Sequence, residues 1–198
     1  MSRQADRPAQ GEALSRAVWE VLAAQGLERL TVRAVAAAAG CTTGLVMHRF
    51  PDRRALLRHA REQLHETTRR RVEALEASAE SPRAALRAVL RQGLATDPET
   101  INESVVWTGF LAAAVTDAEL MEIHRSNNRA WRRRVERLVA AAAPDRPPDR
   151  VPATALALIA MAEGAAAFAA ADPEAYPPAT QEQMLDEALR AFDLDGPA

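Results

Sequence analysis

The sequence predicts an all-α fold in which a small three-helix head at the N-terminus precedes a larger C-terminal bundle of helices. Hydrophobic residues make up 48% of the chain but aromatic residues only 4%, because much of the apolar share is alanine. Alanine is the strongest helix former and adds little bulk, so it favours closely packed helices. Apolar residues recur at helical spacing, and no stretch sustains the alternation of a half-buried strand.

The head is assigned to residues 12–52. Residues 1–11 carry no apolar periodicity and are expected to form a disordered N-terminal arm. The first helix follows, with apolar residues at i, i+3, i+4, i+7 and i+8, and Gly26 ends it.

Two shorter helices complete the head. Thr31 can cap the first of them, and Gly40 ends it by supplying the left-handed conformation of a tight turn. The second short helix is expected to begin at Thr42 or Thr43 and to end near Phe50.

The remaining residues, 53–198, are expected to form the C-terminal bundle. A long helix with an apolar stripe opens it. Capping side chains at Ser81 and Asp97 precede prolines, and capping boxes begin at Thr116 and Thr180. The later helices are expected near residues 82–95, 98–115, 117–143, 152–171 and 180–193.

Composition and charge narrow the class of protein. One cysteine excludes an intramolecular disulfide framework, and the N-terminus lacks the apolar core of a secretion signal. The apolar run 155–171 contains Glu163 and is interpreted as a buried helix, not a membrane span. We therefore expect a soluble cytoplasmic protein with no membrane partner.

Charge is distributed unevenly along the chain. Residues 1–60 hold 9 arginines against 5 acidic residues, whereas residues 81–198 hold 12 arginines against 17. A basic head on an acidic body favours a polyanionic partner at one end of the chain.

A helix, a glycine turn and a second short helix together describe a helix-turn-helix. The small side chains of residues 36–39 let the two helices cross closely, while Val46 and Phe50 can anchor the second helix inward. Thr42, Thr43, Gly44, Leu45, Met47 and His48 are then left near the outer surface. On this pattern alone, an ordinary alanine-rich hairpin with solvated arginines is an equal alternative.

Residues 30–57, LTVRAVAAAAGCTTGLVMHRFPDRRALL, resemble the DNA-binding head of the TetR (tetracycline-repressor) family of bacterial regulators. A threonine opens the second helix, a Thr-Thr-Gly sequence opens the third, and His48-x-Phe50-Pro51 leads into the fourth. Relatives often carry tyrosines where Met47 and Arg49 stand, so the phosphate contact of a tyrosine hydroxyl is missing here, and Arg49 could replace it electrostatically.

The resemblance covers about residues 12–60 and implies a head that binds double-stranded DNA. Hydroxyl groups can bond phosphates or base edges, glycine lets the backbone approach, and arginines neutralise phosphates. The expected DNA-binding residues are Thr31, Arg33, Thr42, Thr43, Gly44, Met47, His48, Arg49 and Arg53.

Residues 105–139, VVWTGFLAAAVTDAELMEIHRSNNRAWRRRVERLV, are similar to the ligand-binding half of the BetI-like branch of this family. That similarity implies a sensor of an unidentified small-molecule effector. Residues 105–115 are apolar on every side and should lie in the middle of the bundle.

The expected effector pocket combines aromatic and apolar walls with a few polar groups. Its candidate residues are Trp107, Phe110, Leu111, His124, Asn127, Trp131, Glu163 and Phe168. Glu163 near aromatic rings would suit a quaternary ammonium ion. Hydrogen bonds between helices, or a salt bridge of Glu163, are the alternatives for the polar members.

The resemblance also implies a homodimer. The small residues of 153–171 allow close approach of a partner helix, and the last helix carries an apolar stripe. The expected interface residues are Leu156, Ile159, Ala160, Ala167, Met184, Leu185, Ala188, Leu189 and Phe192. An internal core stripe is the alternative.

No catalytic triad signature, phosphate-binding glycine loop or metal cluster is evident, so we expect neither an enzyme nor a bound cofactor or metal. The function that follows is a DNA-binding transcriptional regulator, a ligand-responsive repressor that binds a near-palindromic operator as a homodimer. The rival is a helical small-molecule-binding protein or enzyme whose head no longer binds DNA.

Overall fold

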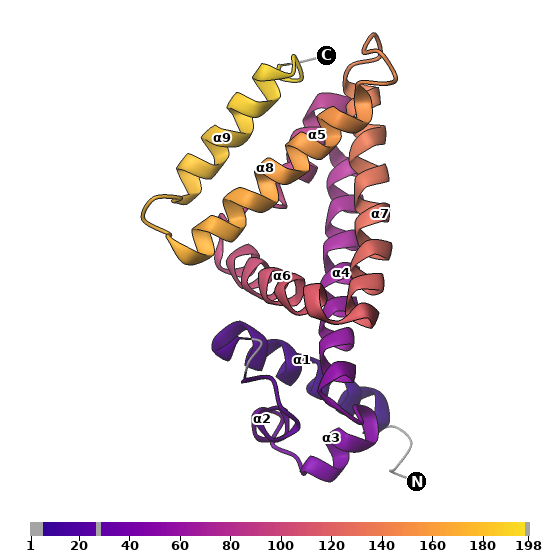
Figure 1. Ribbon diagram of the computed structural model, residues 1–198, viewed down its shortest axis with the longest axis vertical. Helices are drawn as coiled ribbons and strands as arrows, with labels where there is room; N and C mark the ends of the chain where they lie inside the picture. Colours follow the sequence, from indigo (N-terminus) through magenta and orange to yellow (C-terminus); the bar gives the residue numbers. More distant parts are fainter. Residues whose placement is uncertain (1–5, 27–28, 197–198) are drawn as a thin grey trace. The chain divides into compact units, whose positions relative to one another are not determined.

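The computed structural model describes residues 6–26 and 29–196, and in these residues all regular structure is helical (Figure 1). This confirms the all-α prediction. The helices are α1 (Asp6–Gln25), α2 (Val32–Ala38), α3 (Thr43–Arg49), α4 (Arg53–Ser78), α5 (Pro82–Arg91), α6 (Pro98–Thr116), α7 (Ala118–Ala142), α8 (Val151–Ala171) and α9 (Pro178–Ala191).

The chain folds into two compact units. The first comprises Met1–Glu66 with Val105–Met121, and the second comprises Thr67–Ser104 with Glu122–Ala198. Helices α4, α6 and α7 contribute residues to both units. The boundary at residue 52 drawn from the sequence remains a prediction about function, since the packing units divide the chain elsewhere.

Helix α1 begins earlier than expected. It starts at Asp6, so residues 6–11 are helical and not part of a disordered arm, while residues 1–5 lie outside the described residues. Pro8 is compatible with this start, because the first amides of a helix have no intrahelical acceptor for a proline to remove. Leu14 and Val18 fix the helix in the core at 3% and 0% exposure.

Capping side chains set several helix starts. Ser81 Oγ accepts from the Ala84 amide at 3.2 Å, and Asp97 Oδ1 accepts from Thr100 at 3.0 Å, as the sequence predicted. The hydrogen bond from the Thr100 amide is the main reason that the pKa of Asp97 is lowered. Both expected capping boxes are wrong: α7 is capped by Asp117, and α9 begins at Pro178 without a side-chain cap.

The core of the second unit is built from leucines, valines and alanines of α5, α7, α8 and α9. Helices α8 and α9 lie side by side (Figure 1). Helix α8 has the length and apolar composition of a membrane span, yet eight of its residues are buried inside the protein. Gln181 is fully buried, and its amide exchanges two hydrogen bonds of 2.9 Å with the backbone of Ala95.

Helix α6 departs from the sequence prediction. Val106, Phe110 and Ala114 are buried, but Leu111 is 38% and Val115 70% exposed. Residues 105–115 also belong to the first unit, not to the middle of the second. A uniformly apolar helix has no polar face to orient it, so the sequence could not indicate which side would be covered.

Candidate DNA-binding face and effector site

The helix-turn-helix is shaped by local hydrogen bonds and one left-handed glycine. Thr31 Oγ1 accepts from the Ala34 amide at 3.1 Å and caps α2, and Thr42 Oγ1 accepts from the Leu45 amide at 3.3 Å and caps α3. Gly40 adopts a φ of +61° between the helices, a conformation that other residues rarely adopt. The predicted turn is therefore confirmed.

Helix α3 is anchored from one side only. Val46 and Phe50 are buried at 0% and 4% exposure, as the sequence predicted, and Leu45 is half-buried. On α2, Ala36 is buried, whereas Ala37 and Ala38 are exposed, so fewer of the alanines are needed for close packing than expected.

The other side of α3 is open in this chain. Its exposed residues are Thr42, Thr43, Gly44, Met47, His48 and Arg49. Thr31, Arg33 and Arg53 are also exposed. The cap oxygens of Thr31 and Thr42 are engaged as acceptors, but a hydroxyl group retains its proton as a donor. Each of the expected DNA-binding residues is thus accessible, and their contact with DNA remains a prediction.

Two neighbouring arginines have another role. Arg54 Nε lies 3.1 Å from Asp117 Oδ2, and Arg58 Nη1 lies 3.0 Å from Glu119 Oε1. Arg54 also contacts Glu119 at 3.3 Å. These ion pairs bind the start of α4 to the turn between α6 and α7, within the first unit.

His59 connects three helices of the first unit. Its Nε2 lies 2.7 Å from Ser15 Oγ of α1, and its ring packs on Phe50, which follows α3, with 4.9 Å between centroids. Burial, and then the charge of Arg49, lower the pKa of His59. The neutral imidazole is therefore the form that this packing favours.

Two of the expected effector residues surround an internal cation. The Arg61 guanidinium of α4 lies 4.7 Å from the ring centroid of Trp107 and 5.6 Å from that of Phe110. Arg61 is only 7% exposed and Phe110 only 2%. Cation–π attraction to the rings favours this arrangement, which the sequence analysis did not find. The sequence does contain an indication that Arg61 is buried, because Arg61 follows Leu57 by four residues and so lies on the apolar face of α4.

The other effector candidates belong to α7 and α8 of the second unit. His124, Asn127 and Glu163 are half-buried. Trp131 packs against the hydrophobic core, which supports a structural role. Phe168 is wrongly placed in a pocket by the sequence analysis, because it is 59% exposed and stacks on Tyr176 with 5.5 Å between centroids. Leu111 of α6, another candidate for the pocket wall, is 38% exposed.

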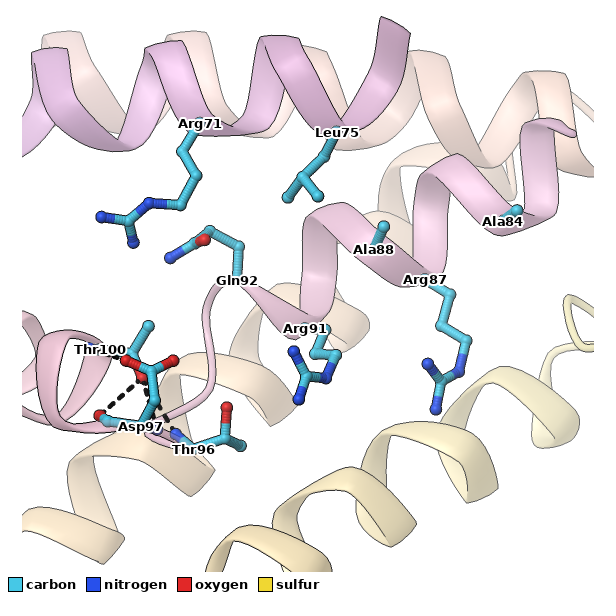
Figure 2. A pocket seen from close by; sticks show the side chains of 10 residues that line it. All are labelled: Arg71, Leu75, Ala84, Arg87, Ala88, Arg91, Gln92, Thr96, Asp97 and Thr100. Atoms are coloured by element: carbon cyan, nitrogen blue, oxygen red, sulfur yellow. Dashed lines mark hydrogen bonds between the residues drawn. The ribbon is translucent and has the colours of Figure 1, made fainter. Parts of the chain in front are cut away.

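The second unit contains a cavity of about 340 Å³ among α4, α5 and the start of α6. Figure 2 shows the side chains of Arg71 and Gln92 approaching each other from facing helices at this cavity. None of the residues expected from the sequence lines it. Its lining residues are Arg71, Leu75, Ala84, Arg87, Ala88, Arg91, Gln92, Thr96, Asp97 and Thr100.

The charges around this cavity are compensated. Arg71 lies 2.9 Å from Glu103, Arg87 lies 2.8 Å from Asp186, and Arg91 contacts Glu182. Burial raises the pKa of Glu103, although its pairing with Arg71 opposes this. Because each arginine already has a carboxylate partner, the cavity offers no excess positive charge to an anion.

The expected dimer residues divide into two groups. Ile159, Leu185 and Leu189 are 6%, 0% and 1% exposed, so they are core residues and their assignment to an interface is wrong. A side chain covered by its own chain has no surface left for a partner. Leu156 and Ala160 are exposed, and the half-buried residues are Ala167, Met184, Ala188 and Phe192.

Two family models match the sequence. Residues 15–60 match the model described as bacterial regulatory proteins, tetR family, and residues 82–193 match the BetI-type transcriptional repressor, C-terminal. The first covers the helix-turn-helix, and the second covers α5 to α9.

Curated relatives agree with these matches. The chain is 31% identical over 131 residues to the HTH-type transcriptional regulator BetI of Stenotrophomonas maltophilia. It is 28% identical over 114 residues to the HTH-type transcriptional regulator PksA of Bacillus subtilis. The alignments span 65% and 58% of this chain, and 66% and 56% of the length of the two relatives.

Solved structures share the whole fold. A transcriptional regulator from Rhodococcus sp. is 29% identical with a TM-score of 0.82, over 91% of this chain and 94% of that one. A regulator from Saccharomonospora viridis, solved in complex with choline, is 15% identical with a TM-score of 0.85, over 93% and 96%. Because the BetI-type model alone matches more than half of the chain, this protein belongs to the TetR family of bacterial regulatory proteins.

Proposed function

We propose that this protein is a transcriptional repressor that binds a near-palindromic operator as a homodimer and is controlled by a small-molecule effector. The observation that supports this most directly is the open face of α3, with Thr43, Gly44, Met47, His48 and Arg49 exposed. A buried anchor on one side of a short helix and a polar, basic face on the other suit insertion into a major groove.

The proposed contacts fall into two kinds. Arg33, Arg49 and Arg53 neutralise phosphates, and the hydroxyl groups of Thr31 and Thr42 donate to phosphate oxygens. Thr43, Gly44, Met47 and His48 face the base edges. This division fits the chemistry of each side chain and the exposure of all these positions.

Dimerisation is proposed through the exposed side of α8 together with α9. Leu156 and Phe168 are 48% and 59% exposed, and small residues such as Ala160 lie on the same side of α8. Covering this apolar surface with the same surface of a second copy would give a symmetric four-helix interface. Two heads would then read two half-sites.

An effector is proposed to act through the contact between α4 and α6 in the first unit. Arg61 occupies the faces of Trp107 and Phe110, and a ligand that binds these rings would have to displace it. Movement of Arg61 would change the packing of α4, the helix that follows the DNA-binding head. Such control requires that the effector binds the two arrangements with different affinity.

The test is retention of the full-length protein on fragmented double-stranded DNA at two salt concentrations. A competent head should retain DNA at low salt and release it steeply as salt rises, because phosphate contacts displace counterions. The rival function is a helical small-molecule-binding protein or enzyme whose head has lost DNA binding, for which Met47 and Arg49 in place of tyrosines are the supporting observation. Absence of retention at both concentrations would favour that rival.

A further inference from the structure

We propose that Met47 reads the 5-methyl group of a thymine in the major groove, and that Gly44 is present so that the base edge can come close enough. This inference rests on the proposed DNA-binding function and assigns one chemical group on the DNA to one side chain. It concerns sequence specificity, which phosphate contacts do not provide.

Met47 is unusual for where it lies. Its exposed fraction is 55%, and among the described residues of α1 to α5 it is the one exposed large hydrophobic side chain. Single exposed apolar residues are common on protein surfaces, so exposure alone indicates nothing. Its position in the helix-turn-helix is informative, because Met47, Thr43 and Gly44 are all exposed on α3 while the neighbouring Val46 is buried.

Gly44 is not required by the fold of this chain. Glycine is less favourable than alanine inside a helix by about 1 kcal/mol. Its φ is not positive, and a Cβ at this position would meet only Thr42 Oγ1, at 3.9 Å, which is ordinary van der Waals contact. Neither the backbone conformation nor internal packing excludes a side chain, so close approach of a partner is the remaining reason for glycine here.

The two residues lie on one face of α3. They are three positions apart, and helical side chains lean toward the N-terminus of their helix. The thioether of Met47 therefore leans over the turn that contains Gly44 and Thr43. The result is an apolar arm beside a flat stretch of backbone, with a hydroxyl group adjacent to both.

The chemistry of the major groove then selects the target. The characteristic groups that base pairs present there are hydrogen-bond donors and acceptors, except for the thymine methyl, which is the large apolar one. A methionine side chain has no strong donor or acceptor, and its flexibility lets it fit an irregular apolar surface. Thymine is therefore the base that Met47 can distinguish.

The experiment uses the full-length protein and an operator selected by it from random double-stranded DNA. Each thymine is replaced in turn by deoxyuridine, which lacks only the 5-methyl group. We expect one thymine per half-site at which the replacement weakens wild-type binding by roughly fourfold, the effect of withdrawing one methyl-sized apolar group from contact. Met47→Ala should bind both DNAs equally at that position and keep the wild-type salt dependence.

Two further variants make the result specific. Met47→Leu retains an apolar side chain and should keep the preference for thymine over deoxyuridine. Arg49→Ala should flatten the salt dependence while leaving the pattern of thymine effects unchanged. Met47 is exposed, so its substitution is not expected to affect folding.

The inference is overturned if no thymine responds in the wild type, or if Met47→Ala shows the same response as the wild type at every thymine. In either case DNA binding itself would stand. Failure to select any operator is a different result, since it would contradict the proposed function and this inference together.

Discussion

Arg49 and Met47 lie two positions apart on α3, and both are exposed. Their chemistry differs, because a guanidinium attracts any phosphate whereas a thioether attracts only apolar groups. We therefore expect Arg49 to contribute affinity for all DNA and Met47 to contribute discrimination between sequences. Single substitutions can separate the two effects.

Arg49→Ala should weaken binding to operator and non-operator DNA by a similar factor. Loss of one phosphate contact should reduce the slope of log K against log salt concentration by about one unit. Binding isotherms at four or more salt concentrations measure this slope. Arg133→Ala, which removes an exposed arginine of α7, should leave it unchanged. An unaltered slope in Arg49→Ala would rule out the phosphate contact.

The stability of the first unit should fall as the pH falls through and below about 6.5, the ordinary pKa of histidine. Burial, followed by repulsion from Arg49, lowers the pKa of His59 in the folded state, so the unfolded state binds more protons in this range. Stability is thus fully present above pH 6.5 and decreases as the unfolded state takes up its proton.

Urea unfolding between pH 7.5 and pH 5.5 tests this dependence. His59→Gln cannot titrate and should show a weaker loss of stability on acidification than the wild type. Thr43→Gln is the control, since Thr43 is exposed on α3 and has no group that titrates in this range, so the substitution should leave the pH dependence unchanged. Equal pH dependence in all three proteins would exclude His59 as the cause.

At the scale of elements, α6 illustrates how a helix without a polar face is oriented by its neighbours. Its buried side includes Phe110, and with Trp107 this residue receives the guanidinium of Arg61 from α4. The opposite side leaves Val115 exposed at 70%. The aromatic faces that a cationic ligand would use are thus already occupied by a cation of the protein.

Arg61→Met should therefore gain affinity for a quaternary ammonium ion. Thermal unfolding in choline chloride, compared with sodium chloride at the same ionic strength, measures the effect. We expect choline to raise the unfolding midpoint of Arg61→Met more than that of the wild type, because the variant removes the guanidinium that competes with choline for the rings. Arg61→Lys keeps a cation near the rings and should respond like the wild type. Equal shifts in all three proteins would contradict this competition.

At the scale of the whole molecule, α8 presents opposite faces to different environments. One face carries Leu158 and Ala162 into the core, and the other leaves Leu156 and Phe168 exposed. This apolar face is the surface through which we propose that a second copy of the chain binds. The proposed dimer would carry two heads, as a near-palindromic site requires.

Leu156→Glu should therefore convert a dimer into a monomer without unfolding the chain. Each copy would place a carboxylate in the proposed interface, where a charge without a partner is costly. Light scattering should report half the mass, and operator affinity should fall by roughly a hundredfold because the second head no longer binds as part of the same molecule.

Val115→Glu is the control for this substitution. Val115 is equally apolar and more exposed, but it lies on α6 and outside the proposed interface. It should leave both the mass and the operator affinity unchanged. A Leu156→Glu protein of unchanged mass would contradict the proposed interface.

The order and type of the helices could be predicted from the sequence. The glycine turn at Gly40 and the caps at Thr31 and Ser81 could be predicted as well. These features are fixed by hydrogen bonds and backbone preferences within one or two turns of chain, so local residues are enough to predict them. The buried anchors Val46 and Phe50 followed from helical periodicity in the same way.

Which faces of the apolar helices are covered depends on tertiary packing and could not be predicted from the sequence. In the folded chain Ile159 and Leu185 are buried and Phe168 is exposed. Arg61 lies against Trp107 and Phe110. Burial depends on neighbours that lie far away in the sequence, and a helix that is apolar on all sides carries no local signal of where they will be. The contact of Arg61 with the two aromatic rings likewise forms only when α4 packs against α6.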